Sequence, residues 1–164
     1  MPLAGKAPRY LGTARPNANH QESTPLSSSR GTPGFSNAGH CIGYRIVDPS
    51  TGGRLLFLPD VAVADERLRG LLAKCDALLF DGTFWSEHEM ENCGAGVLPA
   101  SAMGHLPISG NEGSLKILAA LSVKHKIYLH INNTNPVLFE DSPERAAVSA
   151  AGCLVGRDGM ELAL

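Results

Sequence analysis

The sequence predicts an α/β fold in which helices pack on one face of a mixed β-sheet. Two observations favour this class. Apolar runs of strand length follow one another as a hairpin around residue 50, and later runs alternate with segments that show the 3.6-residue spacing of a helix. Hairpins combined with strand–helix alternation are typical of a layered α/β sheet. The length of 164 residues fits about one such domain.

The first two strands lie on either side of a turn. Residues 41–48 (CIGYRIVD) alternate in polarity, and residues 54–60 (RLLFLPD) form a short apolar run. The turn residues Pro49, Ser50 and Gly52 separate the two segments. We therefore expect a β-hairpin with a somewhat long turn.

The remaining elements are expected to alternate. Residues 63–75 carry leucines at helical spacing with charges between them, and Asp65 is placed to cap this helix. The run 76–82 (DALLFDG) is typical of a buried strand, and residues 83–113 are mostly loop, with one helical turn at 86–92. The same criteria predict a helix over 114–123, a strand over 124–133, a helix over 142–152 and, around Asp158 and Gly159, two short strands or a hairpin.

The composition changes near residue 39. Residues 1–38 are enriched in Pro, Ser, Asn and Thr relative to the rest of the chain, and they show no hydrophobic period. We expect a loop-rich or poorly ordered arm there, followed by a folded unit over 39–164. Such an arm is what a cut through a larger protein would produce.

Charge and cysteine usage exclude several classes. The net charge of −2 gives no support to nucleic-acid binding. No apolar run approaches the roughly 18 residues of a membrane span, and the first ten residues lack the apolar core of a signal peptide. The four cysteines have no paired spacing, which favours reduced thiols over disulfides or a zinc knuckle. We expect a cytoplasmic protein with no nucleic-acid partner and no membrane span.

Polar side chains follow three of the predicted strands. Asp60, Asp81 and His130 each come directly after an apolar run. Strand ends line the ligand crevice of open α/β sheets, and carboxylates with imidazoles suit a metal ion. The alternative for each aspartate is a turn or a helix cap, and for the histidine a structural hydrogen bond.

The stretch after His130 is the most unusual one. His130 begins HINNTNP, whose asparagines and threonine can hold a loop rigid through bonds to the backbone. It is either a plain connector or a stiff loop that directs His130 into a site. His105 lies between glycine and proline in another loop, and His40 enters a strand between glycines. The sequence contains neither GxSxG nor GxxxxGK[ST].

Several long strings resemble one family. GGRLLFLPDVA, DALLFDGTFWSEHEM, MGHLPISGNEGS and KIYLHINNTNPVLFEDSPERAAV are similar to the PqqB family (coenzyme PQQ, pyrroloquinoline quinone, biosynthesis protein B) of the metallo-β-lactamase superfamily. The resemblance implies an αββα sandwich with a metal site at one edge of its two sheets. Family members are about twice as long and carry a histidine/aspartate metal motif and a cysteine cluster. Neither is found here, so the resemblance covers the C-terminal half of that sandwich.

The resemblance also implies roles for five residues. His130 corresponds to the last metal-binding histidine of the superfamily, Asp60 to its bridging aspartate and His40 to a position near its third histidine motif. Asp81 and His105 are expected to act in catalysis and to shape the site rather than to bind the metal first.

The function implied by the family is metal-dependent hydroxylation of the tyrosine of a PQQ precursor, with Fe²⁺ or zinc as the metal and a small molecule derived from the precursor peptide as the partner. Two alternatives stay open. The chain could be a non-enzymatic accessory in the transport of PQQ or its precursor to the periplasm, or an inactive fragment that needs a separate N-terminal half. We expect the isolated chain to hold metal poorly, to be inactive and to self-associate through an exposed apolar face.

Overall fold

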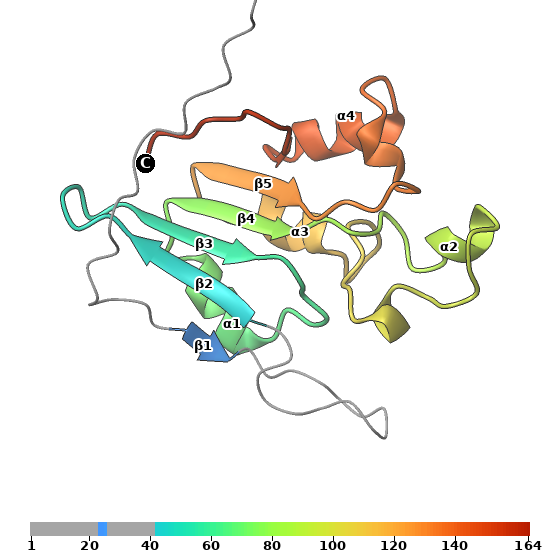
Figure 1. The fold of residues 1–164 in the computed structure, drawn as a ribbon, viewed down its shortest axis with the longest axis horizontal. Coiled ribbons are helices and arrows are strands. Elements are labelled where there is room, and N and C mark those ends of the chain that lie inside the picture. The colour runs from blue at the N-terminus through green and yellow to red at the C-terminus, as the bar shows by residue number, and fades with distance from the viewer. Residues whose placement is uncertain (1–22, 26–41) are drawn as a thin grey trace, which may run out of the picture.

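The computed structural model describes residues 23–25 and 42–164, and within them one mixed sheet forms the frame of the molecule (Figure 1). The sheet has six strands in the order β1-β2-β3-β4-β5-β6. β1 to β3 pair antiparallel, and β3 to β6 pair parallel. The strands are β1 (Ser23–Pro25), β2 (Ile42–Val47), β3 (Arg54–Leu58), β4 (Ala77–Asp81), β5 (His125–Leu129) and β6 (Leu154–Val155).

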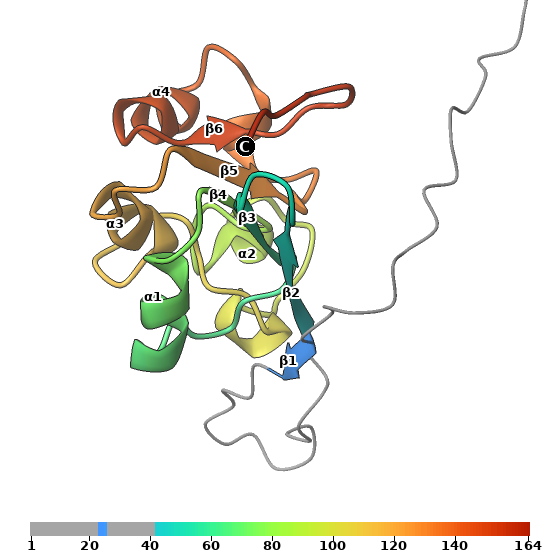
Figure 2. The ribbon, with the colours of Figure 1, turned by 90° about the vertical axis from the view of Figure 1, so that its left-hand side faces the viewer.

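The helices lie on one face of this sheet and beyond one end of it. Figure 2 shows α1, α3 and α4 on the same side of the strands, and Figure 1 shows α2 beyond their carboxyl ends. The predicted α/β class, with helices on one face of a mixed sheet, is confirmed. The helices are α1 (Glu66–Leu72), α2 (Glu89–Asn92), α3 (Ser114–Ala119) and α4 (Pro143–Ala150), with 3₁₀ turns at Ser101–Met103 and Pro136–Leu138.

The core forms between the sheet and the three helices. Leucines of α1 and α3 and a valine of α4 meet alternate residues of the central strands, as period-2 strands and amphipathic helices require. The fully or almost fully buried side chains of this layer include Leu58, Leu72, Leu78, Phe80, Leu118, Tyr128 and Val148. None of the helices in the described ranges is long and apolar enough to cross a membrane.

Two helix starts form as their sequences predict. The Asp65 carboxylate accepts a hydrogen bond from the backbone N–H of Leu68 at 2.8 Å and caps α1. The Ser142 hydroxyl accepts from the N–H of Arg145 at 3.0 Å, and Pro143 occupies the first turn of α4, where no N–H partner is needed.

The helix expected over 114–123 ends at Ala119 instead. The ammonium of Lys126 donates hydrogen bonds to the carbonyls of Leu118 and Leu121, at 3.0 and 3.2 Å. These contacts satisfy carbonyls that a longer helix would bond internally. Because Lys126 lies on β5, the early end of α3 depends on a contact between the helix and this strand.

The structure corrects the expectation for the C-terminal end of the chain. A turn does form around Asp158 and Gly159, but β6 is the one strand found in 153–164, so the predicted second strand is wrong. The chain instead returns toward the β2–β3 turn, where Leu164 lies close to Gly53. Within the arm predicted over 1–38, Ser23–Pro25 forms β1 and pairs with β2.

The sheet face that points away from the helices is apolar. The Tyr44 ring stacks on the Phe57 ring at a centroid distance of 6.1 Å, and Ile46 and Leu154 lie on the same face by strand alternation. Ile46 is 55% exposed and Leu154 47%. We call these four residues the apolar sheet face. Figure 2 shows no helix over it in the part of the chain that the structure describes.

Candidate metal centre

The carboxyl ends of β3, β4 and β5 bring the predicted polar residues to one edge of the sheet. Asp81 is the last residue of β4, His130 follows β5, and Asp60 comes two residues after β3. The three strands are parallel neighbours, with Leu58 opposite Phe80 and Asp81 opposite Leu129. Their ends therefore open onto the same crevice.

Asp81 is the buried centre of the site. Its side chain has no solvent exposure, and its two oxygens accept four hydrogen bonds. Oδ2 accepts from the N–H of Val61 at 2.9 Å and lies 2.8 Å from Nδ1 of His105, and Oδ1 accepts from the N–H and the hydroxyl of Thr83 at 3.0 and 2.6 Å. A carboxylate bonded in this way ties the end of β3, the end of β4 and the loop of His105 together.

His105 is held between a carboxylate and an aromatic ring. Its chain direction is set by Gly104, which has a φ of 88°, and by the bond from the N–H of His105 to the carbonyl of Ala100 at 3.0 Å. The ring of Phe84 meets its ring edge-on at 5.7 Å. The hydrogen bond to Asp81 raises the pKa of His105, and burial opposes this only in part.

His130 adopts a backbone conformation that few side chains tolerate. Its φ is 53°, in the left-handed region. Its Nδ1 lies 2.9 Å from the Thr83 hydroxyl and 3.6 Å from Oδ1 of Asp60, and the side chain is half-exposed. Strained positions of this kind are frequent at functional sites.

The asparagine-rich loop after His130 is anchored rather than merely connecting. The buried amide of Asn135 donates to the carbonyls of Gly82 and Thr83, at 2.9 and 3.3 Å, and its oxygen accepts from the N–H of Val137. The N–H of Asn132 donates to the carbonyl of Thr83 at 3.0 Å. The segments after β4 and after β5 are thereby fixed to each other, which supports the interpretation of a stiff loop.

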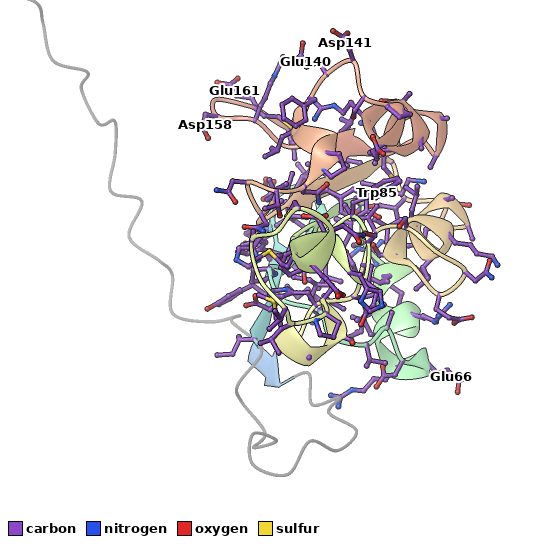
Figure 3. The ribbon with its side chains drawn as sticks, turned by 90° about the vertical axis from the view of Figure 1, so that its right-hand side faces the viewer. Glu66, Trp85, Glu140, Asp141, Asp158 and Glu161 are labelled. Atoms are coloured by element: carbon purple, nitrogen blue, oxygen red, sulfur yellow. The ribbon has the colours of Figure 1, made fainter. Side chains whose placement is uncertain are left out.

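A buried acid adds a second link between the segment after β4 and the segment after β5. The Glu89 carboxylate, 6% exposed, accepts from the N–H of Trp85 and from the hydroxyl of Thr134, both at 2.6 Å. Other acids lie far out on the surface. Figure 3 shows Glu140, Asp141, Asp158 and Glu161 projecting from the periphery of the molecule.

Asp60, His105 and His130 form a set of three donors that could hold a metal ion. One ligand atom from each lies within 4.8 Å of the others. Bonds from zinc to nitrogen or oxygen are about 2.0–2.2 Å, so two ligands of one ion are at most about 4.4 Å apart. A small inward movement of the side chains is enough to close the set. Two imidazoles and one carboxylate suit zinc and ferrous iron.

The structure brings Asp60 and His130 together, and it places a possible donor atom of His105 beside them. Asp81 lies beneath them, bonded to His105. The predicted ligand His40 lies outside the described residues. The ligand assignments stay predictions.

Sequence reasoning did not identify Thr83 or Glu89. Thr83 lies two residues after Asp81, where a hydroxyl often bonds an aspartate in a turn, so that spacing was the available signal. Glu89 had no such signal, because its partners lie in loops without a hydrophobic period.

Comparison with known proteins places this geometry in context. Residues 14–131 match the family model described as β-lactamase superfamily domain. The coenzyme PQQ synthesis protein B of Nitrosococcus oceani is 45% identical over 128 residues, which are 78% of this chain and 41% of that protein. The protein of the same name from Ectopseudomonas mendocina is 45% identical over 140 residues, 85% of this chain and 45% of that protein.

A solved structure is similar in both sequence and fold. The crystal structure of Zn²⁺-bound PqqB from Methylobacterium extorquens has 42% sequence identity and a TM-score of 0.72, and the match covers 76% of this chain and 44% of that one. The chain thus spans less than half the length of the relatives it matches.

Proposed function

Because the chain belongs to the coenzyme PQQ synthesis protein B family of the β-lactamase superfamily, we propose that it forms one wall of a metal centre that hydroxylates the tyrosine of a PQQ precursor. The observation that carries the proposal is the convergence of Asp60, His105 and His130 at the carboxyl edge of the sheet. Two histidines and one carboxylate with open positions are the donor set of non-haem iron(II) oxygenases.

The metal and the protein contribute different parts of this chemistry. Aromatic hydroxylation replaces a ring C–H by C–OH. It consumes one dioxygen, two electrons from an external donor and two protons, and it releases one water. A bound ferrous ion supplies dioxygen activation. Zinc is the ion in the solved relative, and it fits the same three donors but has no redox chemistry of its own.

The protein's own residues hold the donors in place. Asp81 orients the His105 imidazole, and Thr83 contacts the His130 imidazole, so both rings are fixed from behind. The hydrogen bonds of Asn135 and Glu89 hold the loops after β4 and after β5 rigid around the two histidines. Because Asp60 and His130 are both about half-exposed, the open side of the site is accessible to a substrate.

The length of the match favours a second candidate, a half-enzyme that needs a partner chain. Three donors on an open edge hold a metal weakly unless further groups complete the coordination. The chain spans less than half of its relatives, and they would supply such groups from the rest of their length. We propose that the chain alone binds metal poorly and does not turn over.

The test is reconstitution. The chain would be produced alone and together with the remaining half of the Nitrosococcus oceani relative, and both samples would be loaded with Fe²⁺ or Zn²⁺. Metal content is measured by mass spectrometry of the metal, and hydroxylation by the gain of one oxygen atom in a Glu–Tyr-containing peptide. His130→Ala tests the site, and His88→Ala, a change at an exposed histidine of α2's N-cap, is the matched control.

Three outcomes are distinguishable. Iron-dependent oxygen incorporation by the two-chain sample that is lost in His130→Ala supports hydroxylation. Turnover by the chain alone contradicts the half-enzyme proposal. A two-chain sample that forms and holds metal but adds no oxygen, while restoring PQQ production in cells, contradicts hydroxylation and favours the accessory role.

A further inference from the structure

Thr83 occupies the space between the buried carboxylate and the half-exposed imidazole. It lies two residues beyond β4 and is 7% exposed. Its hydroxyl oxygen is 2.6 Å from Oδ1 of Asp81, 2.9 Å from Nδ1 of His130 and 2.9 Å from the carbonyl oxygen of His130. One hydroxyl thus faces three polar atoms.

A hydroxyl has a single proton to donate, and the charged acceptor takes it. The carboxylate of Asp81 is the nearest of the three atoms and can only accept. Hydrogen bonds to an ionised acceptor are about twice as strong as those between neutral groups. The Thr83 hydroxyl therefore donates to Asp81 in preference to the carbonyl of His130, and its oxygen presents a lone pair to Nδ1 of His130.

This direction fixes the protonation of the imidazole. At 2.9 Å from a lone pair of Thr83, Nδ1 of His130 must carry a proton, since two facing lone pairs would repel. In the neutral ring the other nitrogen, Nε2, is then unprotonated. His105 follows the same rule, because its Nδ1 faces the acceptor-only carboxylate of Asp81 at 2.8 Å.

We propose that Thr83 is a positioning residue that holds His130 as the Nδ1–H tautomer, so that Nε2 is the nitrogen offered to a metal ion. Asp81 thereby sets both histidines, His105 directly and His130 through the Thr83 hydroxyl. The proposal deepens the proposed function, and it rests on that function only for the role of the bound metal ion. The tautomer itself is a property of the metal-free chain.

The experiment reads the tautomer by nitrogen NMR. The metal-free full chain is labelled with ¹⁵N-histidine and observed well above the ordinary histidine pKa of about 6.5. The His130 signals are identified by their loss in His130→Gln. We expect a protonated Nδ1 and an unprotonated Nε2. If the wild-type ring carries its proton on Nε2, the proposal is overturned without any variant.

Two substitutions separate a hydroxyl effect from a packing effect. Thr83→Val keeps the shape and removes the hydroxyl, and we expect His130 to lose its preference for Nδ1–H. Thr83→Ser keeps the hydroxyl and should retain the wild-type tautomer. Thr51→Val, which removes an exposed hydroxyl bonded to Asp48 in the β2–β3 turn, is the matched control. An unchanged tautomer in Thr83→Val overturns the proposal.

Zinc titration of the same samples gives a second readout. Loss of a partner behind a metal-binding histidine weakens metal affinity by about 10–100-fold. We expect that loss in Thr83→Val, and near wild-type affinity in Thr83→Ser. Equal zinc affinity in the wild type and Thr83→Val would contradict the role of Thr83. Failure of hydroxylation in the reconstituted sample, with the tautomer as expected, would refute the proposed function and leave this inference standing.

Discussion

His130 combines a strained backbone with a functional side chain. In the left-handed region, an L-residue other than glycine or asparagine costs about 1–2 kcal/mol, and β-branched residues are least tolerated. A histidine kept at a φ of 53° therefore gives up some stability for the position of its imidazole. Stability and metal binding should then respond differently to substitution at this position.

We predict that His130→Asn leaves the free energy of unfolding within about 1 kcal/mol of wild type, because asparagine tolerates this backbone, while zinc affinity falls at least about tenfold. His130→Val, which cannot adopt the conformation easily, should lose about 1–2 kcal/mol. Urea unfolding and zinc titration measure both quantities. A large destabilisation in the asparagine variant, equal to that of the valine variant, would show that the backbone is not the cause.

His105 gives the metal-free chain a defined pH dependence. Its hydrogen bond to Asp81 raises its pKa above the ordinary value of 6.5, so between the two values the folded chain binds more protons than the unfolded chain. The contribution to stability is therefore complete below pH 6.5 and is lost as the pH rises through the folded pKa. We predict that unfolding in the presence of a chelator shows this loss.

The comparison that isolates this effect uses His105→Gln. Its stability should fall less than that of the wild type as the pH rises above 6.5, because the shifted group is gone. His88→Gln, at an exposed histidine, should follow the wild-type curve. If the free energies of unfolding of the wild type and His105→Gln change with pH in parallel, the hydrogen bond between His105 and Asp81 does not govern the pH response.

The residue-scale features were only partly readable in the sequence. Asp60, Asp81 and His130 each follow an apolar run, and parallel strands bring such ends together, so their proximity could be predicted. The contacts of Thr83 and the place of His105 beside the other two donors could not. They depend on the path of residues 83–113, which has few helical turns and no hydrophobic period to mark its course.

At the scale of elements, Asn135 joins two segments that are distant in sequence. It lies after β5, yet its amide bonds the carbonyls of Gly82 and Thr83 beyond β4. Those carbonyls lie at the end of a buried strand, where an unsatisfied group is costly. The hydrogen bonds of the Asn135 amide therefore support the sheet edge and, through Thr83, the His130 imidazole.

We predict that Asn135→Ala costs about 1–3 kcal/mol, the penalty of leaving a buried polar partner unsatisfied, and also weakens zinc binding. Asn133→Ala, an exposed position in the same loop, should change stability by less than about 0.5 kcal/mol. Chemical denaturation measures both. Equal, small effects at the two positions would show that the buried amide does not hold the edge together.

The elements themselves were predicted best where periodicity and caps agree. The hairpin of β2 and β3, the caps of α1 and α4, and the buried strands β4 and β5 follow from local signals. The stop of α3 did not, because Lys126 of β5 satisfies its carbonyls from another element. The final segment lacks its expected return strand because the chain passes back toward Gly53 instead.

At the scale of the whole molecule, the sheet is covered unequally. Three helices bury one face, whereas Tyr44, Phe57, Ile46 and Leu154 form the apolar sheet face on the other. An αββα sandwich places a second sheet against such a face. This chain, which spans less than half of its relatives, shows no second sheet among the described residues. Exposed apolar surface favours association.

We predict that the chain produced alone self-associates through the apolar sheet face. Ile46→Lys, which places a charge at its most exposed position, should shift sedimentation toward the monomer without loss of stability, because Ile46 is 55% exposed. Val97→Lys, at a residue that is 85% exposed in the loop after α2, is the matched control and should leave association unchanged. A wild-type chain that stays monomeric at high concentration, or equal effects of the two lysines, would exclude this face as the contact. Because the remaining half of a relative would cover the same residues, adding that half should also dissociate the self-associated form.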